Sequence, residues 1–325
     1  MHIERIMAEI GKDILKAKAL LEEGQLVAIP TETVYGLAGN AYNLDAVANI
    51  FATKNRPAFD PLIVHTYNID LVKSLVTEIP EKAAILAKQF WPGPLTLLLK
   101  RKDIVPDLVT SGLDTVAIRI PSKEITLELL KSLPFPLVAP SANPFGYISP
   151  TSAQHVEDQL GRKIPYILDG GESHVGIEST IIGFENNTVT VHRLGGVSIT
   201  DIEALIGEVK IKTHSSSNPL APGMLENHYS PVTPIFLGEI KSSLEKYHDK
   251  TIGILSYSTD FGQKKQKILA PDGKMTTAAK NLFAYLRWLD QQHLDLILTE
   301  LVPDEGLGLA INDRLRRAAA KKTTH

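Results

Sequence analysis

The chain has 325 residues, of which 43% are hydrophobic and 22% are charged, and its formal net charge is -3. This composition provides enough apolar material for one large or two smaller domains, and a slightly acidic chain excludes nucleic-acid binding that depends on overall positive charge. The sequence has no cysteine, which excludes disulfides, thiolate metal sites and cysteine nucleophiles and is typical of a reducing compartment.

The N-terminal segment predicts an amphipathic helix over about Ile6 to Glu23, which ends before Gly24, a residue typical of helix C-termini. This segment has no apolar core of the kind found in signal peptides. No apolar run in the chain approaches the ~18 residues needed to span a bilayer. We therefore expect a cytoplasmic protein with no membrane segment.

Strand and helix patterns then alternate up to about residue 210. We expect strands in the segments QLVAIPT, PLIVHT, LTLLLK, TVAIRIP, PLVAPSA, YILDGG, STIIGF and VTVHRLG. We expect helices near 44–53, 81–90 and 123–133, a helix with a capping box of Thr151 and Gln154, and a short helix after Thr200. The segment PTETVYGLAGNA, which follows the first of these strands, is expected to be a loop. This alternation is typical of an α/β sheet covered by helices.

The composition changes at residue 211, where a serine run and several prolines replace the periodic pattern. We interpret 1–210 as a first domain, 211–233 as a linker and 234–325 as a second domain. The second domain again alternates strands, in PIFLG, TIGILSY, KQKILA and LDLILTELVP, with helices over about 276–292 and from Gly308. This pattern predicts a small α/β domain with a parallel sheet.

Familiar nucleotide and metal motifs are absent from the sequence. There is no Walker A pattern, no G-x-G-x-x-G that opens a helix after a strand, and no H-E-x-x-H. The spacing of His155, His174 and His228 does not match that of metal ligands, so we predict no metal site built from protein side chains.

Two cations stand close together before an apolar strand that ends at His65. Lys54 and Arg56 precede Pro57, which stiffens the backbone. A rigid pair of cations suits phosphate, because groups ordered in advance bind at a lower entropic cost. The alternatives remain that the two cations are a solvated surface pair, and that His65 is a strand-end histidine with a structural role rather than a general base.

Further polar residues stand where predicted strands end, which is where open α/β sheets bind ligands. Thr33 follows the first strand in a segment whose alternative interpretation is a plain turn. Arg119 lies inside an apolar strand and needs a carboxylate or phosphate partner, either in the protein or in a ligand. Ser141, Asn143 and Ser149 precede a helix N-terminus, a natural cradle for an anion. Ser179, Thr180 and Arg193 complete what we interpret as one polar, cation-rich pocket.

The segments PTETVYGLA, KNRPAFDPLIVH, WPGPLTLLL, VAIRIP, APSAN with SPTSAQHV, DGG with GIESTII, and PGMLENHYSP occur in this order. Together they resemble the YrdC-domain family in its two-domain form, the threonylcarbamoyl-AMP synthases. The resemblance runs over about residues 5–207 for the YrdC-like domain and continues through the linker and a second domain to about residue 322.

The resemblance implies a twisted, open, mixed α/β sheet with helices and a smaller Rossmann-like α/β second domain. It implies a reaction of L-threonine, bicarbonate and ATP, with Mg²⁺ carried by ATP, that yields L-threonylcarbamoyladenylate and pyrophosphate. It also implies that the product passes to separate transferase proteins, which form threonylcarbamoyladenosine in tRNA; contact of this chain with tRNA itself stays open.

The resemblance also assigns roles to individual residues. Lys54 and Arg56 are expected to neutralise phosphate charge during catalysis, and Tyr229 in the linker to form part of a lid. The expected contacts of threonine and the carbamate are Thr33, His65, Arg119, the backbone at Ala139, and Ser179. The expected contacts of the nucleotide are Arg56, Asp60, Thr115, Ser141, Ser149 and Arg193.

A different class of function stays open as the alternative, namely a non-enzymatic protein that binds structured RNA on the same cationic concave surface. The acidic net charge and the scarcity of aromatic residues among the basic ones disfavour it.

Overall fold

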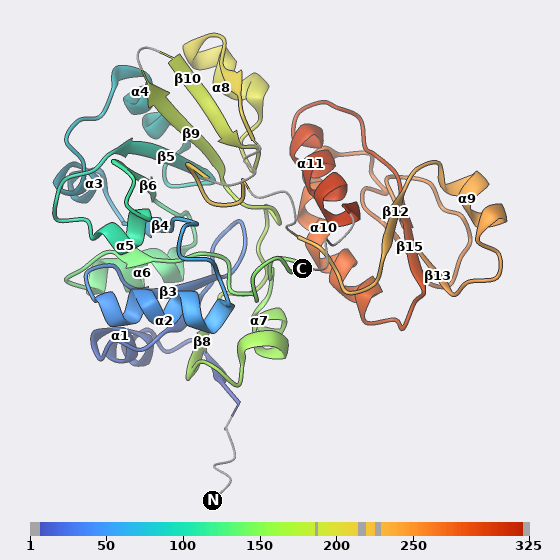
Figure 1. Cartoon of the computed structure of the whole chain (residues 1–325), viewed down its shortest axis with the longest axis horizontal. Coiled ribbons are helices and arrows are strands. Elements are labelled where there is room, and N and C mark those ends of the chain that lie inside the picture. Colours follow the sequence, from blue (N-terminus) through green and yellow to red (C-terminus); the bar gives the residue numbers. More distant parts are fainter. Residues whose placement is uncertain (1–6, 186–187, 214–218, 225–228, 321–325) are drawn as a thin grey trace, which may run out of the picture.

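The computed structural model describes residues 7–185, 188–213, 219–224 and 229–320. These residues form a large α/β domain and a smaller one beside it (Figure 1), the mixed sheet and Rossmann-like second domain expected from the sequence. Within the described ranges, no helix combines the length and the apolar character needed to cross a membrane.

The large domain is built on an 11-stranded sheet with the strand order β1-β8-β2-β3-β7-β4-β6-β5-β9-β10-β11. Parallel and antiparallel pairs are mixed, since β4 runs parallel to β6 while β7 runs antiparallel to β4. The strands are β1 (Glu9–Gly11), β2 (Val27–Ile29), β3 (Gly36–Asn40), β4 (Ile63–His65), β5 (Leu95–Lys100), β6 (Thr115–Arg119), β7 (Leu137–Val138), β8 (Tyr166–Leu168), β9 (Thr180–Glu185), β10 (Thr188–Arg193) and β11 (Lys210–Ile211).

Helices cover this sheet and contribute one side of its apolar core. In α2, for example, Val47, Ile50 and Phe51 are buried, three residues that share one helix face. The helices are α1 (Ile14–Glu22), α2 (Leu44–Lys54), α3 (Ile69–Leu75), α4 (Glu81–Phe90), α5 (Asp107–Thr110), α6 (Glu124–Ser132), α7 (Ala153–Leu160) and α8 (Ile199–Ile206).

The small domain has a four-stranded parallel sheet in the order β12-β15-β13-β14. Its strands are β12 (Ile235–Leu237), β13 (Ile252–Ser256), β14 (Gln266–Ile268) and β15 (Leu296–Thr299), and its helices are α9 (Ile240–Lys246), α10 (Met275–Asp290) and α11 (Gly308–Ala319). Helices α10 and α11 lie on the side that faces the large domain (Figure 1). One buried apolar cluster joins Ile148 and Ile177 of the large domain to Phe283 and Leu286 of α10, so the two domains share a core.

The structure differs from the sequence-based predictions at several places, of which three bear on the first domain's architecture. The predicted N-terminal helix begins only at Ile14, because Asp13 caps it by accepting a hydrogen bond from the Lys16 amide (3.0 Å), and the residues before it form β1 beside β8. The segment GLAGN, predicted as a loop, is β3; its pairing with β2 and β7 overrides the low strand propensity of glycine. The cap of α7 is Ser152 rather than the predicted Thr151.

Candidate active site

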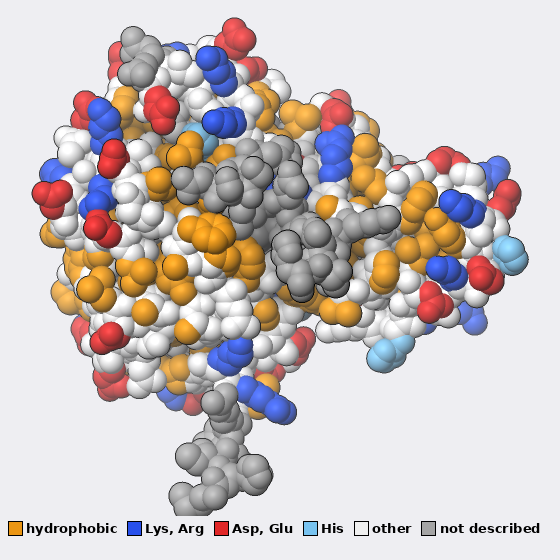
Figure 2. Space-filling model, in the orientation of Figure 1, with side chains coloured by type: hydrophobic (Ala, Val, Ile, Leu, Met, Phe, Trp, Pro, Cys, Tyr) orange, Lys and Arg blue, Asp and Glu red, His pale blue; other side chains and the backbone are white. Residues whose placement is uncertain are grey.

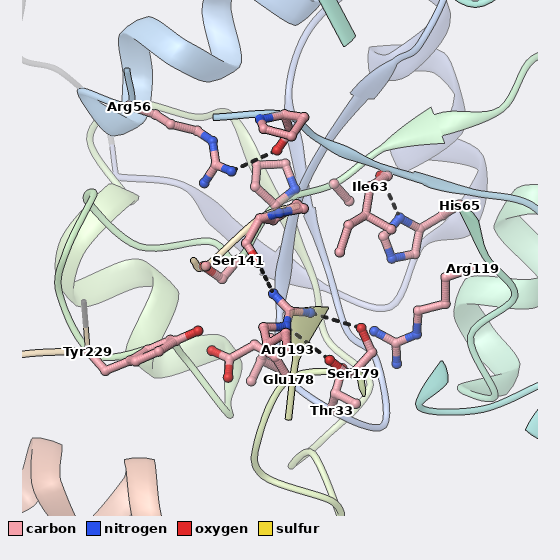
Figure 3. Close-up of a pocket in the computed structure, with 16 residues that line it drawn as sticks. Thr33, Arg56, Ile63, His65, Arg119, Ser141, Glu178, Ser179, Arg193 and Tyr229 are labelled. Carbon is pink, nitrogen blue, oxygen red and sulfur yellow. Dashed lines mark hydrogen bonds between the residues drawn. The ribbon is translucent and has the colours of Figure 1, made fainter. Parts of the chain in front are cut away.

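A pocket lies where several strands of the large domain end, and Pro222, Gly223 and Tyr229 of the linker also line it (Figure 3). We call it the central pocket. It is lined by Thr33, Val34, Arg56, Pro61, Ile63, His65, Arg119, Ala139, Pro140, Ser141, Glu178, Ser179, Arg193, Pro222, Gly223 and Tyr229. All the residues predicted to contact threonine lie here, together with three of the predicted nucleotide contacts and the linker tyrosine.

The sheet register places His65 and Arg119 side by side, because β4 and β6 are parallel and these residues pair at their ends. Arg119 is 4% exposed. Its Nη2 lies 2.6 Å from Oε1 of Glu32, and its Nε donates to the Gly93 carbonyl (3.2 Å). Arg119 therefore has a carboxylate partner inside the protein, and its guanidinium still points into the pocket (Figure 3).

Glu32 belongs to the polar segment PTETVYGLAGNA that follows the first predicted strand, and it is held on both oxygens. Its Oε2 accepts a hydrogen bond from the Ser122 amide (3.0 Å) while Oε1 contacts Arg119. Burial on its own raises the pKa of Glu32, but the charge and hydrogen bond of Arg119, with the amide, outweigh it and hold that pKa below its usual value. Glu32 is thus a charged, buried anchor that fixes the direction of Arg119.

His65 is buried and uncharged at neutral pH. Burial, with the nearby charge of Arg119, lowers the pKa of His65 to about 3. Its Nδ1 lies 3.1 Å from the Ile63 carbonyl oxygen. A carbonyl can only accept, so Nδ1 carries the proton and Nε2 is left as a hydrogen-bond acceptor for a ligand.

Of the two predicted cations, the structure brings only Arg56 to the central pocket. Arg56 Nη2 lies 2.9 Å from Asp60 Oδ2 and also donates to the Pro61 carbonyl (2.8 Å). Lys54 is 1% exposed, and its Nζ donates to the carbonyls of Ser141 and Asn143. Burial, together with the charge of Arg56, lowers the pKa of Lys54 well below its usual value. In this structure Lys54 therefore supports the loop that carries Ser141, and its contact with phosphate stays a prediction.

Three further predicted nucleotide contacts are outside the described lining of the pocket. Asp60 is fully buried against Arg56, and burial raises its pKa above the usual value although three cations oppose this. Thr115 begins β6 while Arg119 ends it, so roughly 13 Å of extended strand separates them. Ser149 is fully buried and its Oγ donates to Glu178. Asp60 and Ser149 therefore contact lining residues of the pocket from outside it, and Thr115 lies away from it.

Arg193 is the pocket arginine without a carboxylate within 4.0 Å among the described residues. Its Nε donates to the Ser179 carbonyl (3.0 Å) and its Nη2 to Ser179 Oγ (2.9 Å), as Figure 3 shows. The hydroxyl of Ser179 also lies 2.7 Å from that of Thr96. Ser179 is therefore fixed in position, and the charge of Arg193 has no direct counter-ion in the described chain.

Glu178 is a carboxylate that lines the pocket, and the sequence patterns did not predict its role. Its Oε2 lies 3.0 Å from Nη2 of Arg314, which comes from α11 of the small domain, and its Oε1 accepts from Ser149. The Arg314 guanidinium also lies 5.1 Å from the ring centroid of Tyr229. The pairing spans 136 positions and two domains, so no local sequence signal could have indicated it.

Tyr229 closes the pocket from the linker side. It is 1% exposed, its backbone φ is 68°, and its ring stacks on Phe283 of α10 at 5.6 Å between centroids. With Tyr229 in this position the pocket encloses a free volume of about 40 Å³, which has room for only a few water molecules.

The outer surface does not offer a broad cationic area on the face shown in Figure 2. Lysine, arginine, aspartate and glutamate side chains of the described residues are interspersed there. Among the described residues there is also no group of three or more His, Cys, Asp or Glu side chains that could hold a metal ion. By contrast, the central pocket gathers Arg56, Arg119 and Arg193 in one place.

Comparison with known proteins gives matches over nearly the whole chain. A family model described as "Telomere recombination" matches residues 19–195, and one described as "Threonylcarbamoyl-AMP synthase, C-terminal domain" matches 197–320. The threonylcarbamoyl-AMP synthase of Pyrococcus abyssi is 41% identical over 321 residues, 93% of each chain. That of Bacillus subtilis is 40% identical and covers 94% of this chain and 92% of its own. The crystal structure of P. abyssi Sua5 complexed with L-threonine has a TM-score of 0.91 at 40% identity, over 97% of each chain.

Proposed function

The chain belongs to the threonylcarbamoyl-AMP synthase family, and from this premise we propose that it converts L-threonine, bicarbonate and ATP to L-threonylcarbamoyladenylate and pyrophosphate. The observation that supports this best is the central pocket itself, which Arg56, Arg119 and Arg193 line together with the neutral His65. Three cations and an uncharged acceptor suit an amino acid at one end and a polyphosphate at the other.

At the amino-acid end, Arg119 would bind the threonine carboxylate while Glu32 holds its guanidinium in place. The related structure described as a complex with L-threonine supports this use of the pocket. His65 would accept a hydrogen bond at Nε2 from the threonine amine or hydroxyl. A pKa of about 3 makes it too weak a base to remove a proton from an ammonium group at neutral pH, so its role is orientation.

At the phosphate end, Arg56 and Arg193 would stabilise the charge that moves during adenylyl transfer. The threonine ammonium group first loses a proton to solvent, and its nitrogen then forms a bond to the bicarbonate carbon with loss of water, which gives a carbamate. A carbamate oxygen then attacks the α-phosphorus of ATP, and the bond to the β-phosphate oxygen breaks as pyrophosphate leaves. Such a reaction depends mainly on positioning and on stabilisation of charge.

Magnesium would enter with ATP. The carboxylates near the pocket are already paired with arginines, Glu32 with Arg119 and Glu178 with Arg314. They fit a pocket in which phosphate oxygens, rather than protein carboxylates, supply most of the ligands of Mg²⁺, as is usual for this ion.

Entry of ATP would require Tyr229 to move. A free volume of about 40 Å³ cannot hold a nucleotide, and Tyr229 with Gly223 of the linker forms the wall on the open side. We therefore keep the predicted lid as part of the proposal: the linker opens for ATP and then closes to exclude water. Release of the product would pass it to separate transferase proteins that modify tRNA.

The test is pyrophosphate release by the purified chain with ATP and Mg²⁺, with L-threonine or bicarbonate left out in turn. We expect release only when both are present, together with threonylcarbamoyl-AMP in the mass spectrum of the same sample. Release that does not depend on threonine would contradict the proposal. If no release occurs while the chain binds structured RNA in a salt-dependent way, the RNA-binding alternative would replace it.

A further inference from the structure

The small domain reaches the central pocket through one buried arginine, Arg314. None of the described lining residues comes from the sheet or helices of this domain, so the contact points to a role for it. Glu178 places a carboxylate in the wall of a pocket that otherwise presents arginines. The other two carboxylates near these arginines, Glu32 and Asp60, are partnered by Arg119 and Arg56 of the large domain. Glu178 is the one that takes its counter-charge from the small domain.

That counter-charge is firmly placed. Arg314 is 0% exposed, and two of its nitrogens approach Oε2 of Glu178 at 3.0 and 3.3 Å. Its third nitrogen donates to the Leu194 carbonyl (2.6 Å), and Asp313 Oδ2 lies 3.3 Å away. Because Leu194 follows β10 directly, α11 is tied to the same stretch of chain that carries the neighbouring pocket residue.

An unpaired Glu178 would oppose the function proposed for the pocket. The pocket is buried, and charges interact more strongly there than in water. Arg193, the cation without a direct counter-ion in the described chain, lies in the same wall of the pocket (Figure 3). Without Arg314, the Glu178 carboxylate would become the nearest available anion for Arg193 and would also repel a triphosphate.

We infer that Arg314 is a positioning residue for nucleotide binding: by neutralising and holding Glu178, it leaves Arg193 free for the phosphates of ATP. This inference rests on the proposed use of the pocket for a nucleotide. According to this inference, the large domain binds ATP tightly only when the small domain supplies Arg314. Threonine should be affected much less, since Arg119 has its own partner in Glu32.

A second interpretation of the same contact is that Arg314 only anchors the two domains to each other. Arg287 of α10 provides the matched control. It is 4% exposed and crosses the same domain boundary, donating to the carbonyls of Ile148 and Ser149 and to the side-chain oxygen of Gln159. It has no carboxylate within 4.0 Å among the described residues, so its removal weakens the anchoring without exposing a negative charge.

The experiment measures the dissociation constants of ATP and of L-threonine by calorimetry on the full chain, for Arg314→Met, Arg287→Met and the double variant Glu178→Gln with Arg314→Met. We expect Arg314→Met to weaken ATP binding about 30-fold or more and threonine binding less than about threefold. The double variant should recover most of the loss, because an uncharged amide in place of the carboxylate needs no counter-charge. Arg287→Met should change ATP binding less than about threefold.

Unchanged ATP affinity in Arg314→Met, or a loss that Glu178→Gln does not reduce, would overturn the inference and leave only the anchoring role. Should Arg314→Met not fold, Arg314→Lys serves instead. It keeps the charge, so we expect less than about fivefold weaker ATP binding, and a 30-fold loss would contradict the inference. Binding does not require turnover. If the wild-type chain binds ATP and threonine but releases no pyrophosphate, the proposed reaction is refuted. The comparison of dissociation constants among the variants would still test the role of Arg314.

Discussion

The two ends of the central pocket differ in what holds their charged groups in place. At one end, Arg119 is fixed by Glu32, and both residues belong to the large domain. At the other end, Glu178 is fixed by Arg314 and Tyr229 rests on Phe283, so both depend on helices of the small domain. The comparison indicates that the amino-acid end is complete within one domain, whereas the phosphate end combines arginines held by the large domain with two contacts that the small domain supplies.

A substitution at the amino-acid end of the pocket should give the largest effect on stability and activity. Arg119→Met removes the partner of a fully buried carboxylate, so the free energy of unfolding should fall by about 3–5 kcal/mol, and the KM for threonine should rise by at least about 100-fold. Denaturant unfolding and threonine-dependent pyrophosphate release measure the two effects. Lys73→Met is the control: its ion pair with Asp70 is 63% and 81% exposed and should contribute less than about 1 kcal/mol. If the two substitutions had equal effects, the Arg119–Glu32 pair would not be the anchor of the amino-acid end.

The contact between the two domains beside the phosphate end can be disturbed without a change of any charged residue. Gly176 has a φ of +79°, and a Cβ there would lie 2.4 Å from the Lys280 Cα of α10. Gly176→Ala should therefore push the domains apart, lower the unfolding free energy by about 2–4 kcal/mol and weaken ATP binding more than threonine binding. Gly171→Ala shares the strain, at a φ of +74°, but meets nothing within 4 Å. It should cost only about 1–2 kcal/mol and spare ATP affinity; an equal loss of ATP binding in both variants would argue against domain docking as the cause.

Lys54→Met tests whether this lysine supports a loop or touches phosphate. Its Nζ donates to the carbonyls of Ser141 and Asn143, so we expect the unfolding free energy to fall by about 1–3 kcal/mol, with a loss of activity of about tenfold through the displaced loop. A loss of several thousand-fold in kcat at unchanged stability would instead restore the phosphate contact predicted from the sequence.

The smallest expected effect concerns pH. His65 has a pKa of about 3 in the folded protein, against about 6.5 unfolded. Because the unfolded chain binds a proton that the folded chain rejects, stability falls as pH drops below 6.5. Between pH 7 and pH 5 this amounts to about 2 kcal/mol. His65→Asn should remove that part of the decline, measured by urea unfolding at both pH values; an unchanged decline would show that His65 is not its source.

Sequence patterns predicted the fold well where side chains carry a local signal. LTLLLK forms β5 and the apolar segment around Arg119 forms β6, since hydrophobic runs bounded by turns favour buried strands. GLAGN carries no such signal and becomes β3 only through its neighbours in the sheet. The same limit applies to the site. Burial of Arg119 in an apolar strand predicted that it needs a partner, but the identity of Glu32 depends on a contact across 87 positions.

Lys54 shows a second limit of prediction from the sequence, which concerns the direction of side chains. Its spacing from Arg56 predicted a pair of cations facing one ligand. In the structure Lys54 is the last residue of α2, and Asn55 then adopts a left-handed conformation with a φ of 53°. This turn directs the two side chains to different places, and a change of backbone direction at one residue is not encoded in the spacing of charges.

The distance along the chain between Glu178 and Arg314 also has a consequence for biosynthesis. They are 136 positions apart, and ribosomes add about 5–20 residues per second, so roughly 7–27 s pass between their synthesis. During that time the Glu178 carboxylate has no counter-ion from α11, and Val34, Ile148 and Ile177 lack the cover that α10 later provides. The nascent large domain therefore exposes these apolar side chains to water, beside its future pocket, until the small domain has been synthesised.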